Sequence, residues 1–269
     1  MSHFVDYTKS AIKNMVKDGL RTRGLRIGNE QRITDALFKA RMLEDLPARI
    51  AFLKHLSPEV AMGLLQFLPY THSQAGQDLF VLSQLGPKRD GYFVEFGATD
   101  GVNISNSYFF EKHLGWSGIV AEPARMWHRD LALNRGCHIE TQCVWSASGA
   151  VLQFSEVAEL STVSDFDEAD HHAATRQHST KYDVRTISLN DLLAKHEAPG
   201  HIDYLSIDTE GSEFDILNAF DFAKHSFGVI TCEHNNTPNR EKIYALLSSH
   251  GYRRVMEDAS GMDDWYLGK

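Results

Sequence analysis

Acidic and amide side chains follow several apolar segments of this chain, at the positions where buried strands would end. The first such segment is Tyr-Phe-Val-Glu-Phe, residues 92–96, and it leads into Gly97, Asp100 and Gly101. A glycine just past a strand allows a sharp turn and lets a ligand approach the backbone, as in the nucleotide sites of open α/β sheets. The spacing here is Gly-x-x-x-Gly, whereas a pyrophosphate-binding loop needs Gly-x-Gly-x-x-Gly.

The two carboxylates of this motif indicate which ligand the turn would accept. Glu95 and Asp100 would repel a pyrophosphate, but they suit a ligand that carries an amino group, a sulfonium and ribose hydroxyls. We therefore predict that the cofactor is S-adenosylmethionine, bound in the bend after the first strand.

Glu122 follows a second apolar segment, residues 118–121. A carboxylate at this place can accept hydrogen bonds from both ribose hydroxyls, so we assign Glu122 to the adenosine; the alternative is a surface glutamate without a role. Asp100, Asn103 and Asn106 lie where a loop leads into a predicted helix. They could cap that helix, or hold the methionine end of the cofactor, or do both.

Two further apolar segments end in side chains that could handle a proton. Asp208 and Glu210 follow one, and Glu233 and His234 follow the next. In methyl transfer the sulfonium is already electrophilic, so the protein must align the acceptor and remove its proton. His234 is a suitable base because imidazole titrates near neutrality, while Asp208 or Glu210 could instead orient the acceptor or accept the proton.

A divalent cation is a third way to activate a hydroxyl at these strand ends. Asp208, Glu233 and His234, together with Asn235, could ligate an ion that acidifies a bound hydroxyl. Carboxylates with an amide suit Mg²⁺, whereas imidazole suits softer metals, so this ligand set does not decide the ion.

From residue 92 onward, strand-like segments alternate with segments of helical periodicity, which predicts an α/β fold with a parallel sheet. Residues 138–144 would form its third strand, and residues 252–256 and 264–267 would close it as an antiparallel pair. Residues 159–181 are polar, acidic and then rich in histidine, so we expect a long mobile loop there.

Helical segments precede the sheet, so we divide the chain into a helical N-terminal extension, residues 1–70, and a cofactor-binding domain, residues 71–269. Within residues 4–20, apolar side chains recur at helical spacing, opposite Lys9, Lys13 and Lys17. Such a basic helix can lie peripherally on the inner face of a membrane. The alternative is that it packs on its own domain or on a second subunit of a homo-oligomer.

The composition excludes some partners and indicates a compartment. A net charge of −9 argues against a nucleic-acid binder, which would carry a basic surface. No apolar run is long enough to span a bilayer, and the N-terminus lacks the pattern of a signal peptide. The three cysteines include no Cys-x-x-Cys pair, so we expect a reducing compartment, the cytoplasm.

Together, these motifs resemble the FkbM-type family of S-adenosylmethionine-dependent methyltransferases. The matching segments occur in the family's order and are residues 73–78, 93–101, 121–123, 207–211 and 233–234. The resemblance covers roughly residues 73–269 and leaves out the N-terminal helices. The chain departs from the family in its first motif, where many members have Asp-x-Gly-Ala-Asn and this chain has Glu95 and Thr99 at the two ends. Glutamate keeps the carboxylate and gives it a longer reach.

The resemblance implies a class I methyltransferase fold, a Rossmann-like, seven-stranded and mostly parallel sheet with helices on both faces. It also implies O-methylation of a small molecule or glycan, often at a sugar hydroxyl of a polysaccharide, glycolipid or macrolide. Asp208, Glu210 and His234 would lie on the acceptor side. The predicted cofactor-binding residues are Gln77, Glu95, Gly97, Ala98, Asp100, Gly101, Asn106 and Glu122.

Two other functions stay open. A methyltransferase fold without catalysis could serve as a binding or scaffold protein through its N-terminal helices, although the acids at the strand ends argue against this. A nicotinamide oxidoreductase is the other alternative, and it predicts that the protein binds NAD.

Overall fold

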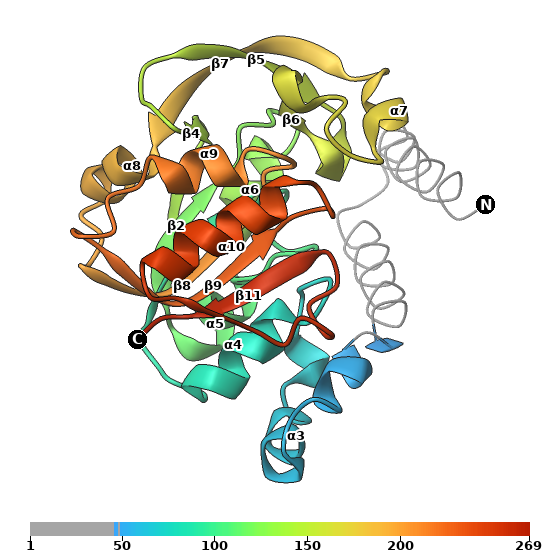
Figure 1. The fold of residues 1–269 in the computed structure, drawn as a ribbon, viewed down its shortest axis with the longest axis vertical. Helices are drawn as coiled ribbons and strands as arrows, with labels where there is room; N and C mark the ends of the chain where they lie inside the picture. The colour runs from blue at the N-terminus through green and yellow to red at the C-terminus, as the bar shows by residue number, and fades with distance from the viewer. Residues whose placement is uncertain (1–45, 48) are drawn as a thin grey trace, which may run out of the picture. The chain divides into compact units, whose positions relative to one another are not determined.

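The computed structural model describes residues 46–47 and 49–269 (Figure 1). The chain divides into two compact units, Met1–Pro47 and Ala48–Lys269, and the second is described here. Residues 49–70, which we predict as part of the N-terminal extension, belong to this second unit. The basic helix predicted over residues 4–20 lies outside the described residues, as do its predicted contacts with a membrane or a second subunit.

A seven-stranded sheet forms the centre of this unit, as predicted, in the order β10-β11-β9-β8-β1-β2-β3. Five neighbouring strands, β9-β8-β1-β2-β3, pair in parallel, and β11 runs antiparallel to both of its neighbours, β9 and β10. The strands are β1 (Tyr92–Phe96), β2 (Ser117–Ala121), β3 (His138–Glu140), β8 (His201–Ile207), β9 (Ser226–Glu233), β10 (Arg253–Val255) and β11 (Asp263–Leu267). The chain leaves β1 toward β2 and β3 and later returns to its other side at β8. This reversal places a crevice at the carboxyl ends of β1 and β8.

Helices cover both faces of the sheet because successive strand residues point to opposite sides. Along β1, Phe93 packs with one hydrophobic cluster and Val94 with the other. The Val94 cluster contains residues of α8 (Leu189–Lys195), α9 (Glu213–Asn218) and α10 (Asn239–Ser249). The Phe93 cluster contains residues of α4 (Gln77–Leu85), α5 (Tyr108–Leu114) and α6 (His128–Asn134). Both faces of β1 are therefore buried, which explains its nearly continuous apolar sequence.

A second sheet of four strands is inserted between β3 and α8, in the order β4-β7-β5-β6. Its strands are β4 (Cys143–Trp145), β5 (Val151–Glu156), β6 (Thr162–Val163) and β7 (Thr180–Ser188). The single third strand predicted over residues 138–144 is therefore wrong. The carboxylate of Glu140 accepts hydrogen bonds from the backbone N–H groups of Thr141 and Gln142, both at 3.0 Å, so β3 ends there and the chain turns into the second sheet.

The long loop expected over residues 159–181 is largely ordered structure. We call residues 157–179, between β5 and β7, the cover segment. It contains β6, the 3₁₀ helices Ala158–Leu160 and Ser164–Phe166, and the short helix α7 (Ala173–Arg176). Arg176 is only 1% exposed, so its charge is buried inside this polar segment.

The residues before the sheet include α3 (Pro58–Leu64), which begins at a proline and is capped by the Ser57 side chain. Arg49 donates hydrogen bonds to Thr71 and to the carbonyl of Ser73, which ties this region to the start of the cofactor-binding domain. Among the helices of the described residues, none combines the length and the apolarity that crossing a membrane requires.

Candidate active site

A pocket opens at the carboxyl ends of β1, β2 and β8, where the strand order predicts one. Gly97, Glu122 and Asp208 line it from the central sheet. Ser161 and Val163 of the cover segment lie on the wall formed by the second sheet and that segment. The cavity between the two walls is narrow, about 50 Å³.

Gly97 brings the bend after β1 directly against the end of β8. Its φ of +76° lies in the left-handed region, and a Cβ at this position would be 2.1 Å from the carbonyl oxygen of Asp208. The Gly97 N–H donates to the carbonyl of Ala121 at 3.1 Å, which holds the bend to β2 as well. Only glycine fits here, and its bare backbone forms part of the pocket wall.

Glu122 lines the pocket with a carboxylate that is already oriented by backbone. Its two oxygens accept hydrogen bonds from the N–H groups of Thr99 and Ala124, each at 2.8 Å. Burial raises the pKa of Glu122 to about 7, although these two hydrogen bonds oppose the shift. Each oxygen keeps a free lone pair, so the carboxylate can still accept hydrogen bonds from ribose hydroxyls.

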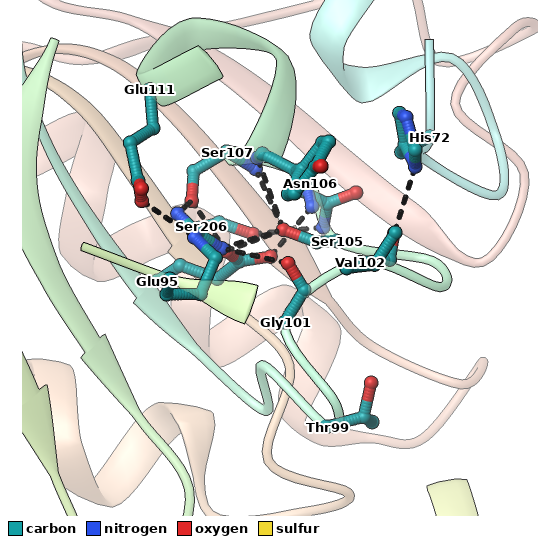
Figure 2. A network of polar contacts seen from close by, with 12 residues as sticks. His72, Glu95, Thr99, Gly101, Val102, Ser105, Asn106, Ser107, Glu111 and Ser206 are labelled. Carbon is teal, nitrogen blue, oxygen red and sulfur yellow. Dashed lines mark hydrogen bonds and ion pairs between the residues drawn. The ribbon is translucent and has the colours of Figure 1, made fainter. Parts of the chain in front are cut away.

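Glu95 lies outside this lining and organises the loop that follows β1 (Figure 2). Its carboxylate accepts hydrogen bonds from the Asn106 N–H at 2.6 Å, from Ser105 Oγ at 2.9 Å and from Ser107 Oγ. Arg135 Nη1 lies 3.5 Å from the same carboxylate. Glu95 therefore fixes the loop that carries the pocket residues, and its direct contact with the cofactor stays a prediction.

The remaining predicted cofactor residues near β1 also have partners within the protein. Asp100 accepts hydrogen bonds from the N–H groups of Val102 and Asn103, at 2.9 and 2.8 Å, and so shapes the turn. The Asn106 side chain donates to Ser206 Oγ at 2.9 Å. Gly101 is left-handed, with φ of +80°.

The last two predicted cofactor residues, Ala98 and Gln77, are buried inside the protein. Ala98 is fully buried. The Gln77 amide donates to Asp263 Oδ2 at 2.8 Å. Neither residue lines the cavity, so both assignments stay predictions.

Three carboxylates meet beside the pocket, which Asp208 and Glu210 line and Glu233 does not. One oxygen from each of Asp208, Glu210 and Glu233 lies within 4.8 Å of the other two, and we call these residues the acid cluster. Burial raises the pKa of Asp208 to about 7, with the neighbouring Asp263 carboxyl as the second cause. Burial also raises the pKa values of Glu210 and Glu233 well above their usual range. Burial and mutual repulsion therefore favour the protonated, neutral forms of these acids when no cation is near.

Arg176 of the cover segment is the cation that contacts this cluster. Its Nη2 donates to Glu210 Oε2 at 2.7 Å, and Asn235 Nδ2 is 3.3 Å from the same oxygen. Arg176 also pairs with Asp170, so its single charge is shared between two acids. Glu233 Oε2 is buried and has no hydrogen-bond partner among the described residues.

His234 is separate from the acid cluster, although it follows Glu233 in the sequence. Its ring Nδ1 accepts a hydrogen bond from the Asn236 N–H at 2.9 Å, so the proton of the neutral ring is on Nε2. Nε2 lies 3.8 Å from Asp264 Oδ1. Burial lowers the pKa of His234, and the residue is not part of the pocket lining. Of the three predicted metal ligands, the structure brings together Asp208 and Glu233.

Comparison with known families identifies the chain. The sequence profile of the methyltransferase FkbM domain matches residues 95–254, more than half of the protein. The chain belongs to the FkbM methyltransferase family. No curated protein matches it.

Solved structures of methyltransferases resemble this FkbM methyltransferase at low sequence identity. The methyltransferase FkbM from Methylobacillus flagellatus KT is 13% identical, with a TM-score of 0.42 over 85% of this chain and 60% of that one. Precorrin-6y C5,15-methyltransferase from Geobacter metallireducens GS-15 is also 13% identical, with a TM-score of 0.37 over 66% and 71%. The CurJ carbon methyltransferase is 10% identical, with a TM-score of 0.36 over 89% and 71%.

Membership of this methyltransferase family implies S-adenosylmethionine as the methyl donor. The residues present fit that cofactor, because the backbone of Gly97 leaves space that a Cβ would fill and the Glu122 carboxylate retains acceptor capacity. The acid cluster beside them suits a ligand that carries positive charge.

The sequence motifs did not point to Arg176, Arg135 or Ser105. The two arginines act on acids 34 and 40 residues away in the chain, and no local spacing marks such partners. Ser105 lies in the polar run Ser-Asn-Ser, residues 105–107, directly before α5. That run resembles an N-cap and is the one signal that could have identified the serine.

Proposed function

We propose that the protein is an S-adenosylmethionine-dependent O-methyltransferase whose acceptor is a hydroxyl of a sugar in a glycan, glycolipid or glycosylated natural product. The observation that carries the proposal is that the acid cluster lies beside the pocket lined by Gly97 and Glu122, with Asp208 and Glu210 in the same lining. This arrangement provides carboxylates that can attract the cationic methyl donor and accept the proton of the acceptor hydroxyl.

In this proposal Glu122 holds the ribose and the backbone of Gly97 allows close approach of the cofactor. When bound, S-adenosylmethionine supplies an electrophilic methyl group. The remaining tasks of the protein are to align the acceptor oxygen with that methyl group and to accept its proton.

We assign to Asp208 the role of the base that accepts the proton of the acceptor hydroxyl. Asp208 lines the pocket, and its pKa of about 7 allows it to be ionised at neutral pH while remaining basic enough to accept a proton. Glu210, held by Arg176 and Asn235, would orient the acceptor. His234, which we predicted as the base, faces Asp264 instead, so Asp208 has the better position.

A divalent cation is a second way to neutralise the acid cluster. The oxygens of Asp208, Glu210 and Glu233 form an all-oxygen set that suits Mg²⁺ better than the mixed set with His234. The unpartnered Glu233 Oε2 fits such a ligand role. The ion would lower the pKa of a coordinated hydroxyl, and activity unaffected by EDTA would exclude it.

Two measurements test the proposal. Calorimetry with S-adenosylmethionine measures cofactor binding, and detection of S-adenosylhomocysteine after incubation with glycan acceptors measures turnover. Analysis of the product then shows whether oxygen or carbon carries the methyl group. Tight binding without turnover on any acceptor would favour the scaffold alternative. Binding of NAD in place of S-adenosylmethionine would favour the oxidoreductase.

A further inference from the structure

We propose that Arg176 is a positioning residue of this active site: it fastens the cover segment to Glu210, and this segment opens to admit the cofactor and closes over it. The inference rests on the proposed function, since it concerns the same pocket. It adds a residue and a moving element that the sequence motifs do not contain.

The first argument is the size of the cavity. At about 50 Å³, it is far smaller than the roughly 300–1,000 Å³ of typical small-molecule sites. One wall must therefore move outward before an adenosyl group can enter. The wall formed by the central sheet is fixed, because the bend at Gly97 is packed against the carbonyl of Asp208 and hydrogen-bonded to Ala121.

The opposite wall includes the cover segment, which contacts the end of β8 at residues 209–211. Arg176 Nη2 donates to Glu210 Oε2 at 2.7 Å. Thr162 Oγ1 is 3.0 Å from the Glu210 carbonyl oxygen. The Phe166 ring lies against Gly211, where a Cβ would be 2.9 Å from the ring. Because these contacts converge on one place, losing the central one should loosen the attachment of the cover segment to the end of β8, while the pairing of β6 with β5 still holds the segment to the second sheet.

Arg176 is also the residue that holds the cover segment together. Its Nη1 and Nη2 pair with the two carboxylate oxygens of Asp170 at 2.8 and 3.0 Å, and its Nε donates to the carbonyl of Leu160 at 2.9 Å. Leu160 lies between Glu159 and Ser161, which line the cavity. One buried guanidinium thus links the pocket wall, α7 and the end of β8, a geometry that a planar group with five donors can provide.

The test compares the dissociation rate of S-adenosylhomocysteine from variants of the full-length protein. This product has no sulfonium charge, so its release reports the closing of the wall and not the attraction of the acid cluster for a cation. We expect Arg176→Gln to speed dissociation by about tenfold or more, because loss of one partner of a buried charge pair acts mainly on the dissociation rate. Arg176→Lys keeps the charge and should restore part of the slow release.

The matched control is Lys181→Gln. Lys181 forms an ion pair with Asp167 of the cover segment at 2.6 Å, but the lysine side chain is 46% exposed and does not reach Glu210. Its substitution should leave the dissociation rate unchanged. An equal effect of both substitutions would reduce Arg176 to a general stabiliser of the segment and overturn the proposal.

Hydrogen exchange on the unaltered protein gives an answer even if Arg176→Gln fails to fold. Saturation with S-adenosylhomocysteine should slow exchange of amides in residues 158–163 and 173–179 more than in α10. Unchanged exchange in these residues would overturn the inference while leaving the proposed function intact. Failure of the unaltered protein to bind either S-adenosylmethionine or S-adenosylhomocysteine would instead end both.

Discussion

At the residue scale, the close contact between Gly97 and Asp208 leads to the first prediction. A Cβ at residue 97 would be 2.1 Å from the Asp208 carbonyl oxygen, so Gly97→Ala must push the two strand ends apart. We expect a loss of about 1–3 kcal/mol in the free energy of unfolding and loss of cofactor binding, measured by urea denaturation and calorimetry.

The control for this variant is Gly149→Ala. Gly149 has a similar φ of +83°, but a Cβ there would meet nothing within 4 Å. It therefore carries the backbone strain without the clash and lies outside the pocket lining. Cofactor affinity that is unchanged in Gly97→Ala would remove Gly97 from the site.

A second prediction separates the two candidate bases. Asp208 must be ionised to accept a proton, so kcat/KM for S-adenosylmethionine, which reports the pKa values of the free enzyme, should rise with pH up to about 7, the pKa of this carboxyl, and then level off. Asp208→Asn should lower the plateau by roughly 10²–10⁴-fold. His234→Gln should change kcat little, because its ring faces Asp264. If His234→Gln is the more damaging substitution, the histidine hypothesis is right and the assignment of Asp208 is wrong.

At the element scale, the loop between β1 and α5 depends on a buried ion pair. Glu95→Gln would leave Arg135 beside a neutral side chain and weaken the hydrogen bonds to Ser105 and Ser107. We expect a loss of about 3–5 kcal/mol in the free energy of unfolding, together with weaker binding of S-adenosylhomocysteine, because this loop carries Thr99 of the pocket.

Glu111→Gln tests whether the effect on binding is specific to the loop. Glu111 pairs with Arg135 Nε at 2.6 Å, but it lies on α5 and does not line the pocket. This variant should lose stability and keep its cofactor affinity. Parallel losses of affinity in the two variants would mean that Arg135, and not the loop held by Glu95, determines binding.

Elements with strong apolar patterns could be predicted from the sequence, whereas elements held by distant polar contacts could not. β1 and β8 are buried on both faces, so apolar and aromatic side chains make up most of both sequences. The cover segment is polar, and its order comes from Arg176 and Thr162, whose partners are 34 and 48 residues away. The break after Glu140 was also missed, because a side chain that accepts hydrogen bonds from the next two N–H groups leaves no mark in hydrophobic periodicity.

The residues of the candidate site also divide into those that the sequence predicts and those that it does not. Motifs at the strand ends predicted Gly97, Glu122, Asp208 and Glu210 correctly as neighbours, since parallel strands place their carboxyl ends at one edge. The direction of a side chain just beyond a strand is set by local backbone, and sequence does not reveal it. His234 follows Glu233 directly, yet its ring is held toward Asp264.

At the scale of the whole molecule, the reversal of strand order collects negative charge at one place. The chain returns to β8 beside β1, and β9 follows, so the ends of β8 and β9 deliver the three carboxylates of the acid cluster to the same place. The acid cluster has one cationic neighbour, Arg176, among the described residues, and Arg176 shares its charge with Asp170. The fold thus creates a site that binds a cation more strongly when its acids are ionised.

This charge predicts how cofactor affinity depends on pH. In the free protein Asp208 has a pKa of about 7, and a nearby sulfonium would lower it, so binding below pH 7 must release a proton. The affinity for S-adenosylmethionine should therefore rise with pH, by up to about tenfold per unit below the pKa, and level off above it. S-adenosylhomocysteine has no sulfonium and should show a flatter profile.

Calorimetry of both ligands from pH 6 to 8, in two buffers of different ionisation enthalpy, measures affinity and proton release together. Asp208→Asn should remove most of the difference. Identical slopes for the two ligands in the unaltered protein would place the sulfonium away from the acid cluster, and the methyl-transfer geometry proposed for Asp208 would then have to be abandoned.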